Sequence, residues 1–199
     1  SKKHAHLETT LTASDAIRTV LTHNLNYLAM WEEAARSPHD IEGVHQTRVA
    51  FRRMRSALTI FRLAIPKQVS APWAEEMREL AGRLGKARDL DVFIDEALGR
   101  IRGNLPLPGA EQLEALAIRQ RDAAYEDVRA MLNSERYTRF KTEFGAWTES
   151  RGWEQAELKK KQRALLDGNI VPFARTVLDR QERRVLEAGA HVDKHAAEE

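Results

Sequence analysis

Apolar residues recur every three or four positions along most of this chain, and the alternation expected of a β-strand is almost absent. That period predicts amphipathic helices. Proline, glycine and capping residues divide the pattern into segments. The sequence therefore predicts an all-α protein with helices over about 14–37, 40–65, 72–100, 110–132, 135–150, 155–166 and 170–189.

The expected boundaries rest on residues that favour helix ends. Ser14, Ser134 and Asn169 are predicted N-caps. Pro72 and Pro172 are placed in the first turns of their helices, where a missing N–H does no harm. A stretch rich in glycine and proline over 103–109 predicts a loop. The other connections are short, so neighbouring helices are expected to pack as antiparallel bundles.

The second predicted helix has two distinct faces. Its apolar side is expected to face the core and consists of Ala50, Phe51, Met54, Ala57, Leu58, Phe61 and Ile65. A basic row lies roughly 120–130° around the helix from that side. The row comprises His45, Arg48, Arg52, Arg55 and Arg62, at relative positions i, i+3, i+7, i+10 and i+17. Core and ligand faces are thus predicted to be separate.

Charge singles out the same segment. The sequence holds 32 Lys and Arg residues against 30 Asp and Glu residues, which is close to neutral overall. Between Glu42 and Glu75, however, there is no acidic residue and there are six basic ones. The basic row spans about a 100° arc and roughly 25 Å of helix. Like charges at this spacing repel, so the expected partner is an extended anion.

Composition limits the remaining possibilities. An apolar fraction of 42% supports a core, and the absence of cysteine excludes disulfides and thiolate metal sites. With no long apolar run and no signal peptide, we expect a cytoplasmic protein without a membrane span. The chain starts at Ser1 rather than a methionine and ends in what reads as a helix start, so we expect a piece of something longer.

Two stretches resemble the CHAD family, an all-helical module that binds inorganic polyphosphate. The first is VHQTRVAFRRMRSALTIFR over 44–62, which contains the family's His, Arg and RRxR pattern as His45, Arg48, Arg52–Arg53 and Arg55. The second is LGKARDLDVFIDEAL over 84–98, with Arg88 and Asp89 at the matching positions. The tail is similar to the linker before the family's second His/Arg block, and that block is missing from this chain.

The resemblance implies two related helical bundles about a pseudo-two-fold axis, with basic faces lining a central groove. Here the second repeat is expected to be incomplete. We expect residues 1–13 to be an extension and 14–199 a CHAD-like domain, with a first His/Arg repeat over 14–133 and the start of a second over 134–199. The resemblance also implies a ligand role for Arg88, weaker roles for Lys86 and Arg83, and a structural role for Asp89.

The chemistry of the row agrees with a phosphate ligand. A guanidinium stays charged and binds phosphate oxygens bidentately, so Arg48, Arg52 and Arg55 are predicted contacts. Arg62 extends the row or pairs with an acid of a neighbouring helix. Arg53 points about 100° away from Arg52, which suits a structural ion pair as well as a phosphate contact.

His45 at the head of the row has two readings. It is either a neutral residue that helps to cap the helix or a phosphate donor whose pKa rises when the anion binds, and its place among the arginines favours the donor.

The sequence is compatible with three functions. The leading hypothesis is a non-catalytic polyphosphate-binding module with no cofactor, no metal and no catalytic residue. The second is an accessory domain of an inorganic triphosphatase, whose catalytic CYTH-class domain would lie upstream in the same polypeptide. The third is a sequence-nonspecific nucleic-acid binder, which is disfavoured because the basic face lacks interleaved aromatic residues for base stacking.

Overall fold

The computed structural model describes residues 4–99 and 109–196, and most of these residues are helical; one isolated β-bridge joins Thr12 and Asn169. The all-α prediction is confirmed. The helices are α1 (Ala13–Trp31), α2 (Ile41–Ile60), α3 (Lys67–Arg83), α4 (Gly85–Val92), α6 (Ala110–Leu132), α7 (Glu135–Glu149), α8 (Lys160–Asp167) and α9 (Ile170–Ala196), with 3-10 turns at Ala34–Arg36, Phe61–Leu63 and Gly152–Glu154 and a π-helical segment at Phe93–Leu98.

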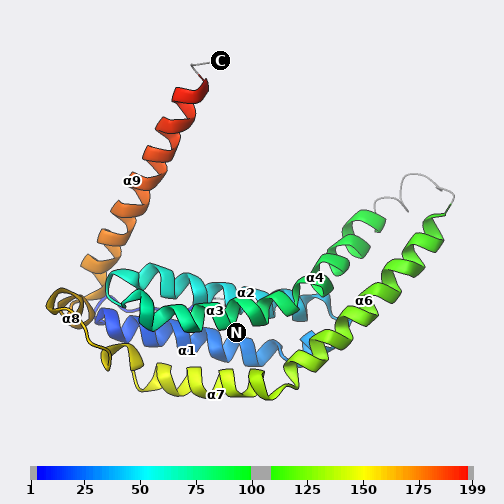
Figure 1. Ribbon diagram of the computed structural model, residues 1–199, viewed down its shortest axis with the longest axis horizontal. Coiled ribbons are helices and arrows are strands. Elements are labelled where there is room, and N and C mark those ends of the chain that lie inside the picture. Colours follow the sequence, from blue (N-terminus) through cyan, green and yellow to red (C-terminus); the bar gives the residue numbers. More distant parts are fainter. Residues whose placement is uncertain (1–3, 100–108, 197–199) are drawn as a thin grey trace.

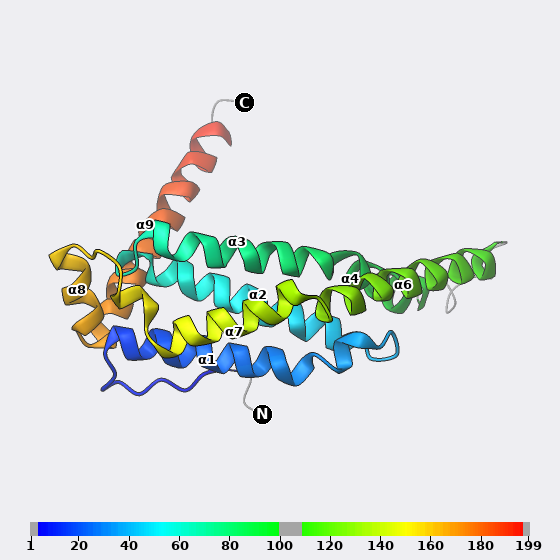
Figure 2. The ribbon, with the colours of Figure 1, turned by 60° about the horizontal axis from the view of Figure 1, so that its bottom comes forward.

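Four of these helices form the body of the molecule. Helices α1, α2, α3 and α7 lie side by side, and Figures 1 and 2 show them as one elongated bundle. At one end α4 and α6 continue as an antiparallel pair beyond the bundle. At the other end α8 lies near the root of α9, and α9 then leaves the body at a steep angle (Figure 1).

The core is where the apolar stripe of α2 meets α1 and α7. All seven residues expected on the apolar side of α2 are buried. Phe51 contacts Phe140 of α7 with ring centroids 5.8 Å apart. A run of aromatic rings continues from Trp73 through Phe144 to Trp147, at 5.2 and 5.6 Å. Burial of each large apolar side chain contributes about 1.5–3 kcal/mol, so this seam fixes how α2 is rotated.

The start of α2 depends on a close backbone approach. The Asp40 side chain accepts a hydrogen bond from the Glu42 N–H and caps the helix. A Cβ added at Gly43 would lie 2.2 Å from the backbone carbonyl carbon of Ala34. Only glycine allows the first turn of α2 to rest on the 3-10 turn at that distance.

Two predicted helix starts are wrong. Helix α1 is capped by Thr12, whose side chain accepts from the Asp15 N–H, while Ser14 is buried inside the helix and accepts from the Trp153 Nε1–H at 2.9 Å. Helix α3 begins at Lys67, so Pro72 lies within it rather than in its first turn. Proline is tolerated there because the carbonyl that loses its partner belongs to exposed Gln68, within reach of water.

Other boundaries also differ from the sequence prediction. The segment expected over 72–100 is divided at Leu84 into α3 and α4, and α8 starts at Lys160, because 152–154 forms a 3-10 turn. Helix α9 continues past Gly189 to Ala196. The expected loop over 103–109 lies outside the described residues except for Gly109, whose φ of 86° is left-handed. Helix α6 and the caps Ser134 and Asn169 are confirmed.

Candidate anion-binding site

Three residues of the basic row, Arg48, Arg55 and Arg62, lie along the seam between α2 and α3. Because α3 runs back along α2, the end of α3 is beside the start of the row. Arg48 donates from Nη1 to the backbone oxygen of Ala81 at 2.8 Å, which fixes its half-buried side chain at this seam. Gly85 leaves space for it, since a Cβ at that position would lie 3.5 Å from the same Nη1.

Farther along, the seam opens into a groove. This α2/α3 groove has a volume of about 180 Å³. Its cationic lining comes from both helices and consists of Arg55, Arg62, Lys67 and Arg78, together with the acid Glu75. Arg62 and Lys67 are exposed and Arg55 is half-buried. Two helices therefore present guanidinium and ammonium groups to one concave surface.

The opposite end of the row brings His45 and Arg88 together. Arg88, on α4, makes a long hydrogen bond to the backbone oxygen of Ile41 at 3.5 Å. Burial lowers the pKa of His45, and the positive charge of Arg88 lowers it further, against the opposing effect of Glu42. His45 is therefore held in its neutral form at neutral pH in the free protein. An anion that neutralises Arg88 would reverse part of this shift.

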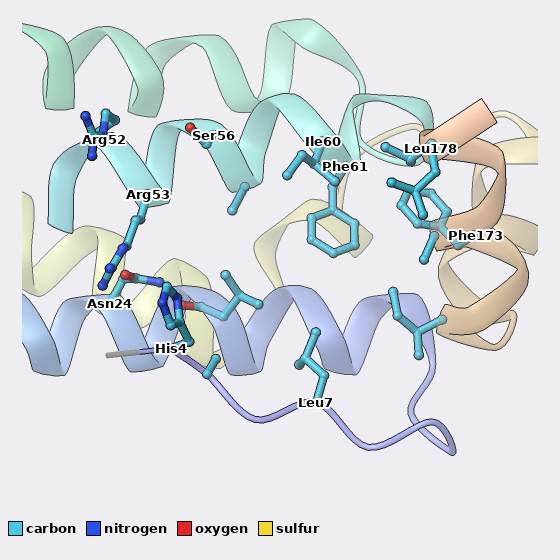
Figure 3. A pocket seen from close by; sticks show the side chains of 16 residues that line it. His4, Leu7, Asn24, Arg52, Arg53, Ser56, Ile60, Phe61, Phe173 and Leu178 are labelled. Atoms are coloured by element: carbon cyan, nitrogen blue, oxygen red, sulfur yellow. The ribbon is translucent and has the colours of Figure 1, made fainter. Parts of the chain in front are cut away.

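The arginines at 52 and 53 diverge. Figure 3 shows Arg53 crossing from α2 towards Asn24 of α1, while Arg52 points to the other side. The guanidinium of Arg53 lies 5.4 Å from the ring centroid of Tyr27, a cation–π contact that gives it a structural role. Arg52 is exposed at the edge of the row.

The two remaining candidates on α3 and α4 are exposed. Lys86 lies about 160° around α4 from Arg88, so the two side chains leave the helix in different directions. Arg83 is also exposed. The structure therefore does not bring Lys86 together with Arg88 or the basic row.

Carboxylates neutralise little of the row. Among the described residues, none of Arg48, Arg52, Arg55 and Arg62 makes an ion pair with a carboxylate, whereas Arg78 is paired with both Glu75 and Glu79. The hydrogen bond from Arg78, followed by the charge of Arg78 and then of Arg55, lowers the pKa of Glu75. Glu75 is thus an ionised acid beside Arg55, and it can be displaced because its side chain is exposed.

A buried acid lies close to this end of α2 but not in the row. Asp91 is 1% exposed and accepts from the Tyr125 O–H at 2.8 Å, while its Oδ1 has no hydrogen-bond partner. Burial raises the pKa of Asp91. This pair ties α4 to α6. The structural acid of the segment is therefore Asp91, whereas Asp89 is exposed.

The α3 wall of the groove was not identified from the sequence. Lys67 and Arg78 are eleven residues apart and fall within about 20° of one another on a helix. That signal is present in the sequence, but it gains meaning only once α3 is known to lie antiparallel to the basic row.

This arrangement agrees with what comparisons with known proteins find. The family model for the CHAD domain matches residues 19–199. The chain therefore belongs to the CHAD family, which is associated with polyphosphate binding.

A solved structure supports the same assignment. The crystal structure of the CHAD domain from the plant Ricinus communis superimposes with a TM-score of 0.76 at 29% sequence identity, over 96% of this chain and 61% of that one. The chain thus spans less than two thirds of the matched protein.

The matches to curated relatives cover a shorter part of the chain. Uncharacterized proteins from two strains of Mycobacterium tuberculosis are 35% identical over 82 residues, which is 41% of this chain and 16% of theirs.

Among the described residues, no helix is long and apolar enough to cross a membrane.

Proposed function

We propose that the basic row and the α2/α3 groove bind inorganic polyphosphate, and that this chain acts as a binding module without catalysing a reaction. The observation that carries the proposal is that Arg48 and Arg55 on α2, and Arg62 on the 3-10 turn after it, line the seam with α3 and have no carboxylate partner among the described residues. The ligand class of the CHAD family agrees with it.

The row suits a linear string of phosphates. At 1.5 Å per residue it extends for roughly 25 Å, so several successive phosphates can be contacted at once. Each guanidinium offers paired donors to phosphate oxygens. Lys67 and Arg78 face the string from α3, and His45 with Arg88 receive it at the far end. Glu75 would release Arg78 as phosphate takes its place.

The distribution of aromatic residues favours polyphosphate over nucleic acid. Trp153 is fully buried, and the half-buried Trp73 and Trp147 pack on Phe144 at the edge of the core. None of them lines the α2/α3 groove, so the groove offers no aromatic ring to stack with bases, which is how proteins hold single strands without sequence preference. Cations without stacking surfaces suit a ligand that has phosphates but no bases.

A matched pair of variants tests the proposal. Arg55→Ala/Arg62→Ala should weaken binding of long-chain polyphosphate at least tenfold at low salt, because each charge-assisted hydrogen bond is worth about 1.5–3 kcal/mol. It should also lower the slope of log K against log salt by about two units, one for each lost contact. Titration calorimetry over a series of salt concentrations measures both quantities.

The control removes the same charge elsewhere. Lys160→Ala/Lys161→Ala changes two exposed cations of α8 that do not line the α2/α3 groove, and should leave affinity within about twofold because charges in solvent are screened by salt. An equal loss of affinity in the two variants would show that binding depends on total charge and not on this site. Absence of saturable binding by the unmodified chain would refute the proposal. Single-stranded DNA should fail to displace bound polyphosphate.

A further inference from the structure

The α2/α3 groove contains one acid among its cations. Of the described residues that line it, Glu75 alone carries a carboxylate, beside cationic side chains that come from both walls. In the sequence, Glu75 is also the residue that ends the acid-free stretch after Glu42. A carboxylate in this place works against an anionic ligand, because like charges repel. The position of this acid therefore bears directly on how an anion enters the groove.

Arg78, one turn farther along α3, holds the Glu75 carboxylate at the groove. The Arg78 Nε lies 3.0 Å from one carboxylate oxygen and 3.2 Å from the other, and the Arg78 Nη2 donates to the same group. Residues three apart on a helix are neighbours on its surface, so the pair forms within one element. A guanidinium binds the oxygens of a phosphate with the same forked set of donors. The Glu75 carboxylate thus occupies the donors that a phosphate would use.

Arg55, on the α2 wall of the groove, acts on the same carboxylate. The hydrogen bond from Arg78 lowers the pKa of Glu75 most, and the charges of Arg78 and Arg55 lower it further. The carboxylate is therefore ionised at neutral pH, in a groove whose cations come from α2 and α3. In the free protein, the charge of Arg78 is thus already neutralised by an acid of the groove itself.

A second acid contacts Arg78 from outside the groove. The Glu79 Oε1 lies 3.1 Å from the Arg78 Nη2, but Glu79 lines a separate pocket on the side of α3 that faces α6. Removal of the Glu79 charge leaves Arg78 bound to Glu75. Removal of the Glu75 charge leaves the described lining of the groove without a carboxylate. The two acids therefore form a matched pair for an experiment.

We propose that Glu75 is an internal counterion of the α2/α3 groove, which takes the place of a phosphate in the free protein and gives it up when polyphosphate binds. The contact is autoinhibitory, because the ligand must exchange for the carboxylate that Arg78 already holds. Tethering on the same helix gives this carboxylate a high effective concentration, so it competes with anions in solution. The inference rests on the proposed function and adds that the protein itself limits the affinity of the site.

The experiment compares two neutral isosteres on α3. Glu75→Gln keeps the size of the side chain and should raise the affinity for long-chain polyphosphate by about fivefold or more at low salt, since it removes both an ion pair and a repelling charge. Glu79→Gln removes the same charge from the same helix and should leave affinity within about twofold, because Glu75 still holds Arg78. Titration calorimetry measures both affinities, and circular dichroism checks that both variants keep their helical content.

The salt dependence of binding gives a second readout. In the unmodified chain, a phosphate that reaches Arg78 displaces a carboxylate instead of a salt anion. In Glu75→Gln it displaces a salt anion, so the slope of log K against log salt should steepen by about one unit. Glu79→Gln should keep the slope of the unmodified chain.

The outcomes separate this inference from the proposed function. Equal gains in affinity for the two glutamine variants would assign the effect to net charge and overturn the inference. Unchanged affinity of Glu75→Gln would also overturn it, whereas saturable binding by the unmodified chain would leave the proposed function intact. If neither the unmodified chain nor Glu75→Gln binds polyphosphate, the proposed function is refuted and the inference falls with it.

Discussion

His45 shows how a single residue couples proton binding to anion binding. Its neighbours are Arg88, Arg52 and Arg48, which disfavour its charged form, and Glu42, which favours it. A phosphate string that neutralises the arginines should raise its pKa. The bound state then holds more protons than the free state, so affinity increases as pH falls.

The expected result is tighter polyphosphate binding as pH drops from 8 to about 5.5, across the ordinary histidine pKa of about 6.5. The gain begins near the pKa of the bound state and levels off below the lowered pKa of the free state. His45→Ala should flatten this dependence. Calorimetry in several buffers also counts the protons taken up, and long chains keep terminal phosphate titration negligible. Unchanged pH dependence in the variant would assign the effect to other groups.

The Tyr125 hydroxyl tests the buried carboxylate of the α4/α6 pair. Tyr125→Phe removes the one hydrogen bond that the buried Asp91 side chain receives from the described residues. We expect a loss of about 1–3 kcal/mol in the free energy of unfolding at neutral pH, because a buried acceptor is left without a partner. Denaturant unfolding measures it.

Tyr27→Phe is the matched control, since that hydroxyl donates to the neutral amide oxygen of Gln46 at 2.7 Å. It should cost about 0.5–1.5 kcal/mol. The burial-raised pKa of Asp91 means that the folded state binds a proton more tightly than the unfolded state, so this acid makes stability decrease as pH rises through its titration range. Equal costs for the two variants would argue that Asp91 is solvated.

At the scale of elements, the approach of α2 to the preceding 3-10 turn decides where the basic row begins. Gly43→Ala would place a methyl group 2.2 Å from the backbone carbonyl carbon of Ala34. Backbone must move, so we expect destabilisation of about 1–3 kcal/mol and weaker polyphosphate binding through displacement of His45.

Gly82→Ala provides the opposite control on α3. A Cβ there meets nothing within 4 Å, so the substitution should stabilise the protein by about 0.5–1 kcal/mol through helix propensity. Thermal unfolding of the two variants gives the comparison. If both variants are destabilised to a similar extent, the close approach of Gly43 to Ala34 is not the reason why position 43 requires glycine.

At the scale of the whole molecule, ligand binding should stabilise the fold. The row and groove join α2 to α3 along the bundle, so a polyphosphate that binds only the folded state adds about 2.7 kcal/mol at a hundred times its dissociation constant. Unfolding followed with and without ligand measures the shift. Arg55→Ala/Arg62→Ala should lose most of it, and an equal shift in that variant would place the binding surface elsewhere.

The sequence by itself determined the helical class, most helix centres, the apolar side of α2 and the basic row, because each depends on periodicity within one segment. It also carried the CHAD resemblance that the family model confirms. The wrong starts of α1 and α3 have causes outside the local sequence pattern. Ser14 accepts a hydrogen bond from Trp153 across the core instead of capping α1. Pro72 is tolerated inside α3 because water can reach the carbonyl that loses its helical partner.

Only the tertiary structure decided which residues oppose the row. The pairing of α2 with α3 brought Lys67 and Arg78 to the groove, and the turn into α4 set Arg88 beside His45. Packing against Tyr27 separated Arg53 from Arg52. Periodicity in the sequence shows which face of its own helix a residue occupies. Which other helix packs against that face depends on the burial of apolar residues throughout the core.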